Sequence, residues 1–177
     1  MIIIGGDLSL ASPGLARIDT VTRKFTAAAF PPPKTHSSGH PREKWILDRV
    51  REHAAGAELA VLEEMPYHIK GTAVHALAGL RRLVTHELWK LGVPYVEVNV
   101  AHLKVYATGD SRADKDAIML RTGRTFGEDQ FDGNNDAADA LWLACMGADH
   151  AGRPLVEVSA TRRAALAKVP WPDGGTP

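Results

Sequence analysis

The chain opens with Met1-Ile2-Ile3-Ile4-Gly5-Gly6-Asp7, a short apolar run that ends in two glycines and an acid. Branched apolar residues bounded by glycine predict a buried strand over residues 2–6, so that Asp7 lies where the strand stops. In open α/β sheets functional residues collect at strand ends, and an acid there suits metal or phosphate chemistry. Taken alone, an aspartate after a strand more often caps a turn. The rest of the chain decides between these two interpretations.

The segments that follow predict an antiparallel meander. A turn at Ser12-Pro13-Gly14 reverses the chain, and residues 15–20 and 24–30 have the length and composition of strands. Residues 31–41 are rich in proline and serine, lack periodicity and predict an exposed loop. The chain therefore begins with three strands, and a loop separates them from the rest.

Strands and helices alternate in the middle of the chain. Apolar residues spaced three and four apart predict a long amphipathic helix over residues 72–91, between strands at residues 59–64 and 95–98. A strand, a helix and a second strand in succession imply a parallel crossover within one sheet. The sequence thus predicts an α/β domain with a mixed five-stranded sheet and helices on both faces. Further helices are expected over residues 42–55, 113–122 and 136–148.

The composition fits one globular domain. A chain of 177 residues with 45% hydrophobic and 24% charged residues can bury an ordinary core. We expect residues 1–150 to form the domain and residues 151–177 to form a C-terminal extension, partly disordered beyond about Val169. The single cysteine, Cys145, excludes an internal disulfide, and no stretch predicts a signal peptide or a membrane span. A cytoplasmic location is expected.

Basic and acidic residues are segregated along the chain, although they balance overall at 21 each. Residues 104–124 carry five Lys or Arg against three aspartates, whereas residues 128–139 are acidic without a single Lys or Arg. A basic ridge beside an acidic pocket suits a metal-dependent nuclease, because the metal neutralises the carboxylates. The zero net charge argues in the other direction, since nucleic-acid-binding proteins are usually basic. The basic residues are Lys104, Arg112, Lys115, Arg121 and Arg124.

Two adjacent acids, Glu63 and Glu64, end the apolar strand Leu59-Ala60-Val61-Leu62. Neighbouring residues of a strand point to opposite faces of the sheet, so only one of the two acids shares a face with Asp7. Periodicity does not say which one, because both faces of this strand are apolar.

Asp136 and Asp139 give the strongest signal in the sequence. They lie three residues apart, and hence on one face of a predicted helix whose other residues are almost all apolar. Burying two unpaired carboxylates is costly, and a bound cation would compensate both. Alternatively, Asp136 is the N-cap of the helix and Asp139 is a first-turn residue that the helix dipole favours. Acids from three segments without a Cys/His pattern favour magnesium or manganese over zinc.

The order of these acids resembles that of the RuvC family of Holliday junction resolvases, part of the ribonuclease H-like superfamily. The similarity rests on Ile4-Gly5-Gly6-Asp7, Val61-Leu62-Glu63-Glu64 and Asn135-Asp136-Ala137-Ala138-Asp139-Ala140-Leu141, and extends over roughly residues 1–148. The family commonly has Asp-Pro-Gly after the first strand, whereas this chain has Asp7-Leu8-Ser9, a form associated with viral and more distant members. The resemblance implies a ribonuclease H-like fold with Asp7, Glu63, Asp136 and Asp139 as metal ligands.

The resemblance also implies an activity, which is hydrolysis of branched DNA such as four-way junctions with two Mg²⁺ ions, for which Mn²⁺ can substitute. It makes Lys115 a catalytic residue that neutralises charge on the scissile phosphate. Without the resemblance, Lys115 could equally be a solvated lysine in the first turn of a helix. Lys104 falls on a second basic position near the phosphate, and Arg112 belongs to the same basic segment. Tyr67 stands next to Pro66, where family members have an aromatic wedge.

Symmetric cutting of a junction needs two active sites, so we expect a homodimer in which the helix over residues 72–91 supplies an apolar face. A bacterial or viral origin is expected, and the sequence does not identify a branch-migration partner. Three alternatives stay open. A ribonuclease H would take its second acid from the first helix, at Glu43 or Glu52. A pre-ribosomal RNA nuclease or a non-catalytic DNA-binding module could have the same fold.

Overall fold

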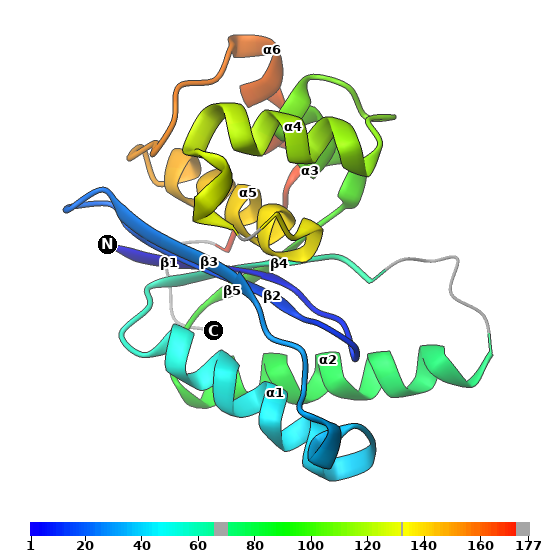
Figure 1. Ribbon diagram of the computed structural model, residues 1–177. Helices are drawn as coiled ribbons and strands as arrows, with labels where there is room; N and C mark the ends of the chain where they lie inside the picture. Colours follow the sequence, from blue (N-terminus) through cyan, green and yellow to red (C-terminus); the bar gives the residue numbers. More distant parts are fainter. Residues whose placement is uncertain (66–70, 132, 173–177) are drawn as a thin grey trace.

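A single mixed sheet forms the centre of the computed structural model, which describes residues 1–65, 71–131 and 133–172 (Figure 1). Tyr67, expected to contact DNA, lies outside the described residues. The strand order is β3-β2-β1-β4-β5, with β1 in the middle. The strands are β1 (Ile2–Asp7), β2 (Gly14–Asp19), β3 (Lys24–Ala29), β4 (Leu59–Glu63) and β5 (Tyr95–Val98).

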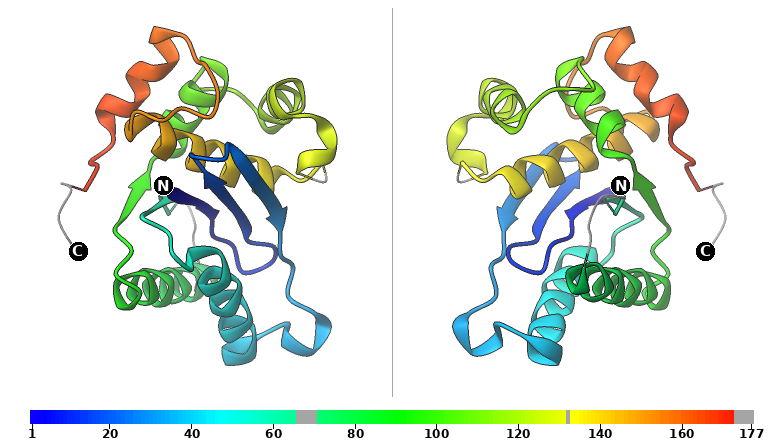
Figure 2. Two further views of the ribbon diagram at one scale, coloured as in Figure 1. Left: turned by 90° about the vertical axis from the view of Figure 1, so that its left-hand side faces the viewer. Right: turned by 90° about the vertical axis from the view of Figure 1, so that its right-hand side faces the viewer.

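Helices cover both faces of this sheet, as the two side views in Figure 2 show. On one face lie α1 (Gly39–Ala54) and α2 (Thr72–Lys90). On the other face α5 (Asn135–His150) packs directly against the strands, and α3 (Val100–Thr108) and α4 (Lys115–Phe126) pack against α5. None of the helices among the described residues has the length and apolar character that a membrane span needs.

The strand pairings confirm the predicted topology. β1, β2 and β3 form an antiparallel meander, in which Asp7 pairs with Gly14. β4 pairs parallel to β1, and β5 pairs parallel to β4, as a crossover through α2 requires. The predicted α/β class, with a mixed five-stranded sheet and helices on both faces, is therefore confirmed.

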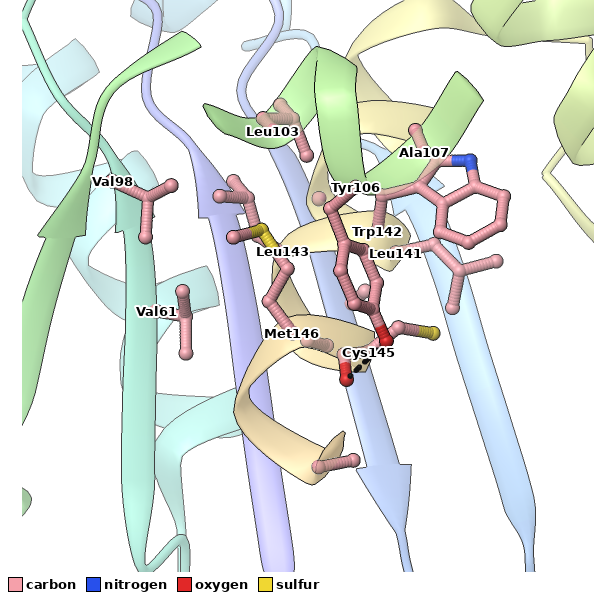
Figure 3. Packing of buried hydrophobic residues seen from close by; sticks show 14 of the residues in the cluster. Val61, Val98, Leu103, Tyr106, Ala107, Leu141, Trp142, Leu143, Cys145 and Met146 are labelled. Atoms are coloured by element: carbon pink, nitrogen blue, oxygen red, sulfur yellow. Dashed lines mark hydrogen bonds between the residues drawn. The ribbon is translucent and has the colours of Figure 1, made fainter. Parts of the chain in front are cut away.

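Alternation along the central strands assigns their residues to two separate cores. Ile3 of β1 and Val61 of β4 pack into the core that contains α3 and α5, part of which Figure 3 shows. Ile4 and Leu62, one position further along each strand, pack into the core formed with α1 and α2. Because both faces are buried, the strands read as continuous apolar runs without a polar side.

Helix α5 is buried along most of its length, as its apolar sequence predicted. In Figure 3 Trp142 and Met146 lie among side chains from α3 and from the strands. Close packing on the sheet depends on small residues at the contact. A Cβ placed on Gly5 of β1 would lie 1.9 Å from the carbonyl oxygen of Ala140, and one on Gly14 would lie 1.9 Å from that of Asp136. The backbone of α5 therefore lies directly on β1 and β2.

The structure differs from the sequence expectation in the segments around α3 and after α5. Helix α3 itself was not expected, and neither were α6 (Ala160–Arg163) and the 3-10 helix η3 (Ala164–Lys168). Arg162 donates from its guanidinium to the carbonyl oxygens of Tyr106 and Ala107, each at 2.7 Å. Trp171, where no fixed structure was expected, stacks on His150 with ring centroids 4.1 Å apart. Residues 151–172 thus pack onto α3 and α5.

Two further 3-10 turns flank the helices. Within the expected loop over residues 31–41 lie η1 (Lys34–His36) and the first turn of α1. A second turn, η2 (Glu128–Gln130), joins α4 to the segment before α5. Neither turn contributes a buried residue, so both remain surface connections.

Candidate metal centre

Three carboxylates meet where β1 and β4 end beside the N-terminal part of α5. Asp7, Glu63 and Asp139 each offer one oxygen, and these oxygens all lie within 4.8 Å of one another. Asp7 shares the α5 face of β1 with Ile3 and Gly5, because strand side chains alternate. Since α5 rests on the same face, its N-terminal part brings Asp139 to the two strand ends. We call Asp7, Glu63 and Asp139 the carboxylate cluster.

The two adjacent acids of β4 have different surroundings. Glu63 follows Val61 on the α5 face and joins the carboxylate cluster. Glu64 accepts a hydrogen bond of 2.8 Å from the side-chain amide of Asn99. Asn99 in turn caps α3 by accepting from the backbone N–H of Ala101 at 3.0 Å. The packing of β4 against α5 thus separates two residues that the sequence pattern left equivalent.

Asp136 lies beside the carboxylate cluster without being one of its three members. Its negative charge contributes to the raised pKa of Asp7, so the two groups are close. The N-cap of α5 is Asn134, whose side chain accepts from the backbone N–H groups of Asp136 and Ala137 at 2.8 and 3.1 Å. The alternative interpretation, in which Asp136 caps the helix, is therefore wrong.

Burial makes the carboxylate cluster costly to ionise. It raises the pKa of Asp7 to about 7, with the charges of Asp139 and Asp136 adding to the effect. It raises the pKa of Glu63 to about 8, helped by Asp7 and Asp139, and that of Asp139 to about 6. The buried Oδ1 atom of Asp139 has no hydrogen-bond partner among the described residues. Clustered acids with an unsatisfied inward oxygen are the donor set that a hard divalent cation fits.

Two of the predicted basic residues act on these acids. Burial raises the pKa values of Asp7, Asp136 and Asp139, and the charge of Lys115, the exposed first residue of α4, partly offsets this rise. Lys104 on α3 does the same for Glu63 and Asp139. Arg112, by contrast, has a side chain that is 92% exposed and lies 4.0 Å from Asp110.

A third cation, Arg81, was not identified from the sequence. It lies on α2, is buried, and donates from Nε to Oε1 of Glu97 at 2.7 Å. Its Nη2 donates to the backbone carbonyl oxygen of Glu63. A signal was available, because Arg81 is four residues after Leu77 and three before Val84, on the apolar row of the helix.

The raised pKa values predict how the stability of the metal-free protein depends on pH. Carboxyls of the unfolded chain ionise near pH 4, whereas the native cluster still holds protons up to about pH 6 to 8. The native state binds more protons in this window, so the free energy of unfolding falls as pH rises from about 5 to about 8. Added Mg²⁺ should reverse the fall at pH 8, because it binds the ionised native cluster.

Thermal melts in EDTA and in Mg²⁺ across this pH range measure the effect. Asp139→Asn serves as the comparison, because it removes one of the three titrating groups and should flatten the slope. A metal-free melting temperature that rises between pH 5 and pH 8 relative to Asp139→Asn would contradict the prediction.

Comparisons with known proteins identify similar chains. A protein named crossover junction endodeoxyribonuclease RuvC from Gloeobacter violaceus is 36% identical over 93 residues, which are 52% of this chain and 53% of the relative. The protein of the same name from a Synechococcus strain is 30% identical over 152 residues, which are 83% of this chain and 97% of the relative. No family model matches the chain.

A solved structure shows the same fold. T. thermophilus RuvC in complex with a Holliday junction substrate aligns with a TM-score of 0.68 at 18% identity. The alignment covers 86% of this chain and 97% of that one. At this identity the likeness shows the architecture alone.

Proposed function

The chain belongs to the RuvC family of crossover junction endodeoxyribonucleases, and on this premise we propose that it cuts branched DNA, four-way junctions included, with divalent metal. The observation that carries the proposal is the carboxylate cluster, formed by residues from three distant segments at the position where strands end. A structural role for three mutually repelling acids would be unfavourable without a cation.

The ligands that we propose are Asp7, Glu63, Asp136 and Asp139, with Mg²⁺ as the native ion and Mn²⁺ as a substitute. Hard carboxylate oxygens favour these ions. When bound, the metal supplies an activated water and stabilises charge on the phosphate. The protein holds the acids on the ends of two paired strands and on a buried helix, so the oxygens are fixed before the ion arrives.

Lys115 and Lys104 would serve the DNA rather than the metal. The charges of both lysines act on the pKa values of acids in the carboxylate cluster, and this supports a role beside a phosphate bound there. A fixed cation stabilises the extra negative charge that develops on the phosphate during hydrolysis. We propose Lys115 for this catalytic role, and Lys104, Arg112 and Tyr67 for contacts to the DNA.

Lys115→Ala and Lys104→Ala should slow cleavage far more than they affect folding. We expect single-turnover rates on a junction to fall by about two orders of magnitude, as for removal of one stabilising donor. Melting temperatures should change little, because Lys115 is exposed and Lys104 is partly exposed. Lys44→Ala, at an exposed α1 lysine paired with Asp48, is the matched control. Normal rates in both active-site variants would show that the phosphate lies elsewhere.

Cleavage assays on several substrates test the proposed function itself. Purified protein with Mg²⁺ should cut four-way or flap DNA in preference to linear duplex, RNA–DNA hybrid and single-stranded RNA. The ribonuclease H alternative is disfavoured by the fold, because α1 lies across the sheet from α5 and its acids pair locally. The Glu43 carboxylate lies 2.9 Å from Nδ1 of His40, and the Glu52 carboxylate forms an ion pair of 2.6 Å with Arg49. Preferential cutting of the RNA–DNA hybrid would contradict the proposal and support the ribonuclease H alternative.

We also propose that the protein acts as a homodimer in the bacterial cytoplasm. Two large apolar residues of α2 are exposed, Leu83 at 39% and Trp89 at 57%, and a twofold contact would cover such a surface. Light scattering of the purified chain measures the mass directly. Residues 1–150 would form the nuclease domain, with residues 151–177 as its C-terminal extension.

A further inference from the structure

Arg81 is a charged residue in a buried position of α2. It is 9% exposed and lies on the apolar row of α2, between Leu80 and Val84 in a helix that packs on the sheet. A buried guanidinium is costly unless its donors find acceptors. Here the acceptors come from two neighbouring strands, and one of them is the backbone carbonyl of Glu63, a member of the carboxylate cluster.

The two hydrogen bonds of Arg81 connect α2 with β4 and β5. The Nε atom donates to the carboxylate of Glu97 on β5 at 2.7 Å. The Nη2 atom donates to the carbonyl oxygen of Glu63, the last residue of β4. A guanidinium presents its donors in a rigid planar fork, so engaging both acceptors fixes their relative positions. Lysine cannot reproduce this arrangement with its single ammonium group.

The position of the Glu63 peptide bears directly on its side chain. β4 ends at Glu63, and just beyond it the backbone N–H of Glu64 donates to the carbonyl of Val98 at 2.8 Å. The carbonyl of Glu63 is held by Arg81, and together the two bonds fix the peptide that joins Glu63 to Glu64. This peptide separates a side chain directed to the carboxylate cluster from one that accepts from Asn99.

We propose that Arg81 is a positioning residue, which orients Glu63 for metal binding by holding its backbone carbonyl. The inference rests on the proposed function, because it assumes that the carboxylate cluster binds a divalent ion. Arg81 touches neither the ion nor the DNA in this assignment. It acts through Glu63, as outer partners of metal ligands generally do.

If Arg81 acted only through its charge, its removal would have the opposite effect on metal affinity. Arg81 carries a positive charge close to Asp7 and Glu63, and a positive charge repels a divalent cation. If charge alone mattered, Arg81→Met would bind metal more tightly, and Arg81→Lys would bind it as the wild type does. If position matters, both variants bind metal more weakly. The sign of the change therefore distinguishes the two roles.

Calorimetric titration of the full chain with Mn²⁺, without DNA, provides the test. We expect Arg81→Met to weaken Mn²⁺ binding by roughly 10- to 100-fold, the usual cost of losing an outer partner, and Arg81→Lys to fall between it and the wild type. Arg82→Met is the matched control, because Arg82 is the exposed neighbour on the same helix. Its affinity should equal that of the wild type.

Each outcome has one meaning. Unchanged or tighter binding in Arg81→Lys overturns the positioning role, even if Arg81→Met fails to fold. A melting temperature in EDTA, measured for every variant, separates lost binding from lost structure. A wild-type protein that binds no Mn²⁺ contradicts the proposed function, and the inference is then overturned with it. Wild-type binding that Arg81→Lys retains in full overturns the inference alone.

Discussion

Glu63→Gln should abolish metal-dependent cleavage of branched DNA, whereas Glu64→Gln should cut at close to the wild-type rate. The amide is nearly isosteric with the carboxylate, but it lacks the negative charge that holds a divalent ion. Glu63 belongs to the carboxylate cluster, so we expect a loss of at least about two orders of magnitude, more than the cost of removing an outer partner. Glu64 accepts from Asn99, and a glutamine oxygen can accept the same bond.

The comparison requires binding and cutting to be measured separately. Gel shifts in Ca²⁺ should show junction binding by both variants, while single-turnover cleavage across a Mg²⁺ titration should separate them. An inactive Glu64→Gln beside an active Glu63→Gln would reverse the assignment of the two acids. Two active variants would exclude the metal site itself.

Gly5→Ala should destabilise the protein by about 3 kcal/mol or more, the upper range for overpacking a core. The added Cβ would lie 1.9 Å from the carbonyl oxygen of Ala140 and 2.7 Å from the backbone nitrogen of Ala144. Both contacts are with the backbone of α5, so no side-chain rotation relieves them and the helix must move away from β1. For a chain of this size the melting temperature should fall by roughly 10 °C.

Gly79→Ala is the matched control for this prediction. Gly79 lies on α2, and a Cβ there would meet nothing within 4 Å. Alanine in a helix interior is favoured over glycine by roughly 0.5–1 kcal/mol, so this variant should be as stable as the wild type or slightly more stable. Urea titrations of the two variants measure the difference. Equal stability of Gly5→Ala and the wild type would show that α5 does not rest on β1 at this distance.

The element order and the sheet topology could be predicted from the sequence because they depend on local patterns. The meander follows from turn residues between short strands, and the crossover follows from one long amphipathic helix between two apolar runs. Helix α3 was missed for an equally local reason. Its nine residues contain valines and a threonine, and its ends depend on Asn99 as a cap and on Gly109, whose φ is 95°.

The candidate site was only partly accessible from the sequence. Which of Glu63 and Glu64 faces Asp7 depends on which face of β4 receives α5, and both faces are apolar. Arg81 stood among apolar residues of a helix, and its partners Glu97 and Glu63 come from strands far away in sequence. Pairings of this kind are properties of the folded chain, so a periodicity within one element does not contain them.

The dispersal of the acids over the chain links nuclease activity to completed folding. Asp7 and Glu63 lie in the first half of the sequence, but Asp139 comes with α5, which is synthesised last among the elements that pack on the sheet. A ribosome-bound or prematurely ended chain without α5 lacks one acid of the carboxylate cluster and the helix that packs directly on one face of the sheet. If the proposed ligands are right, such a fragment is expected to lack nuclease activity until α5 has folded onto the sheet.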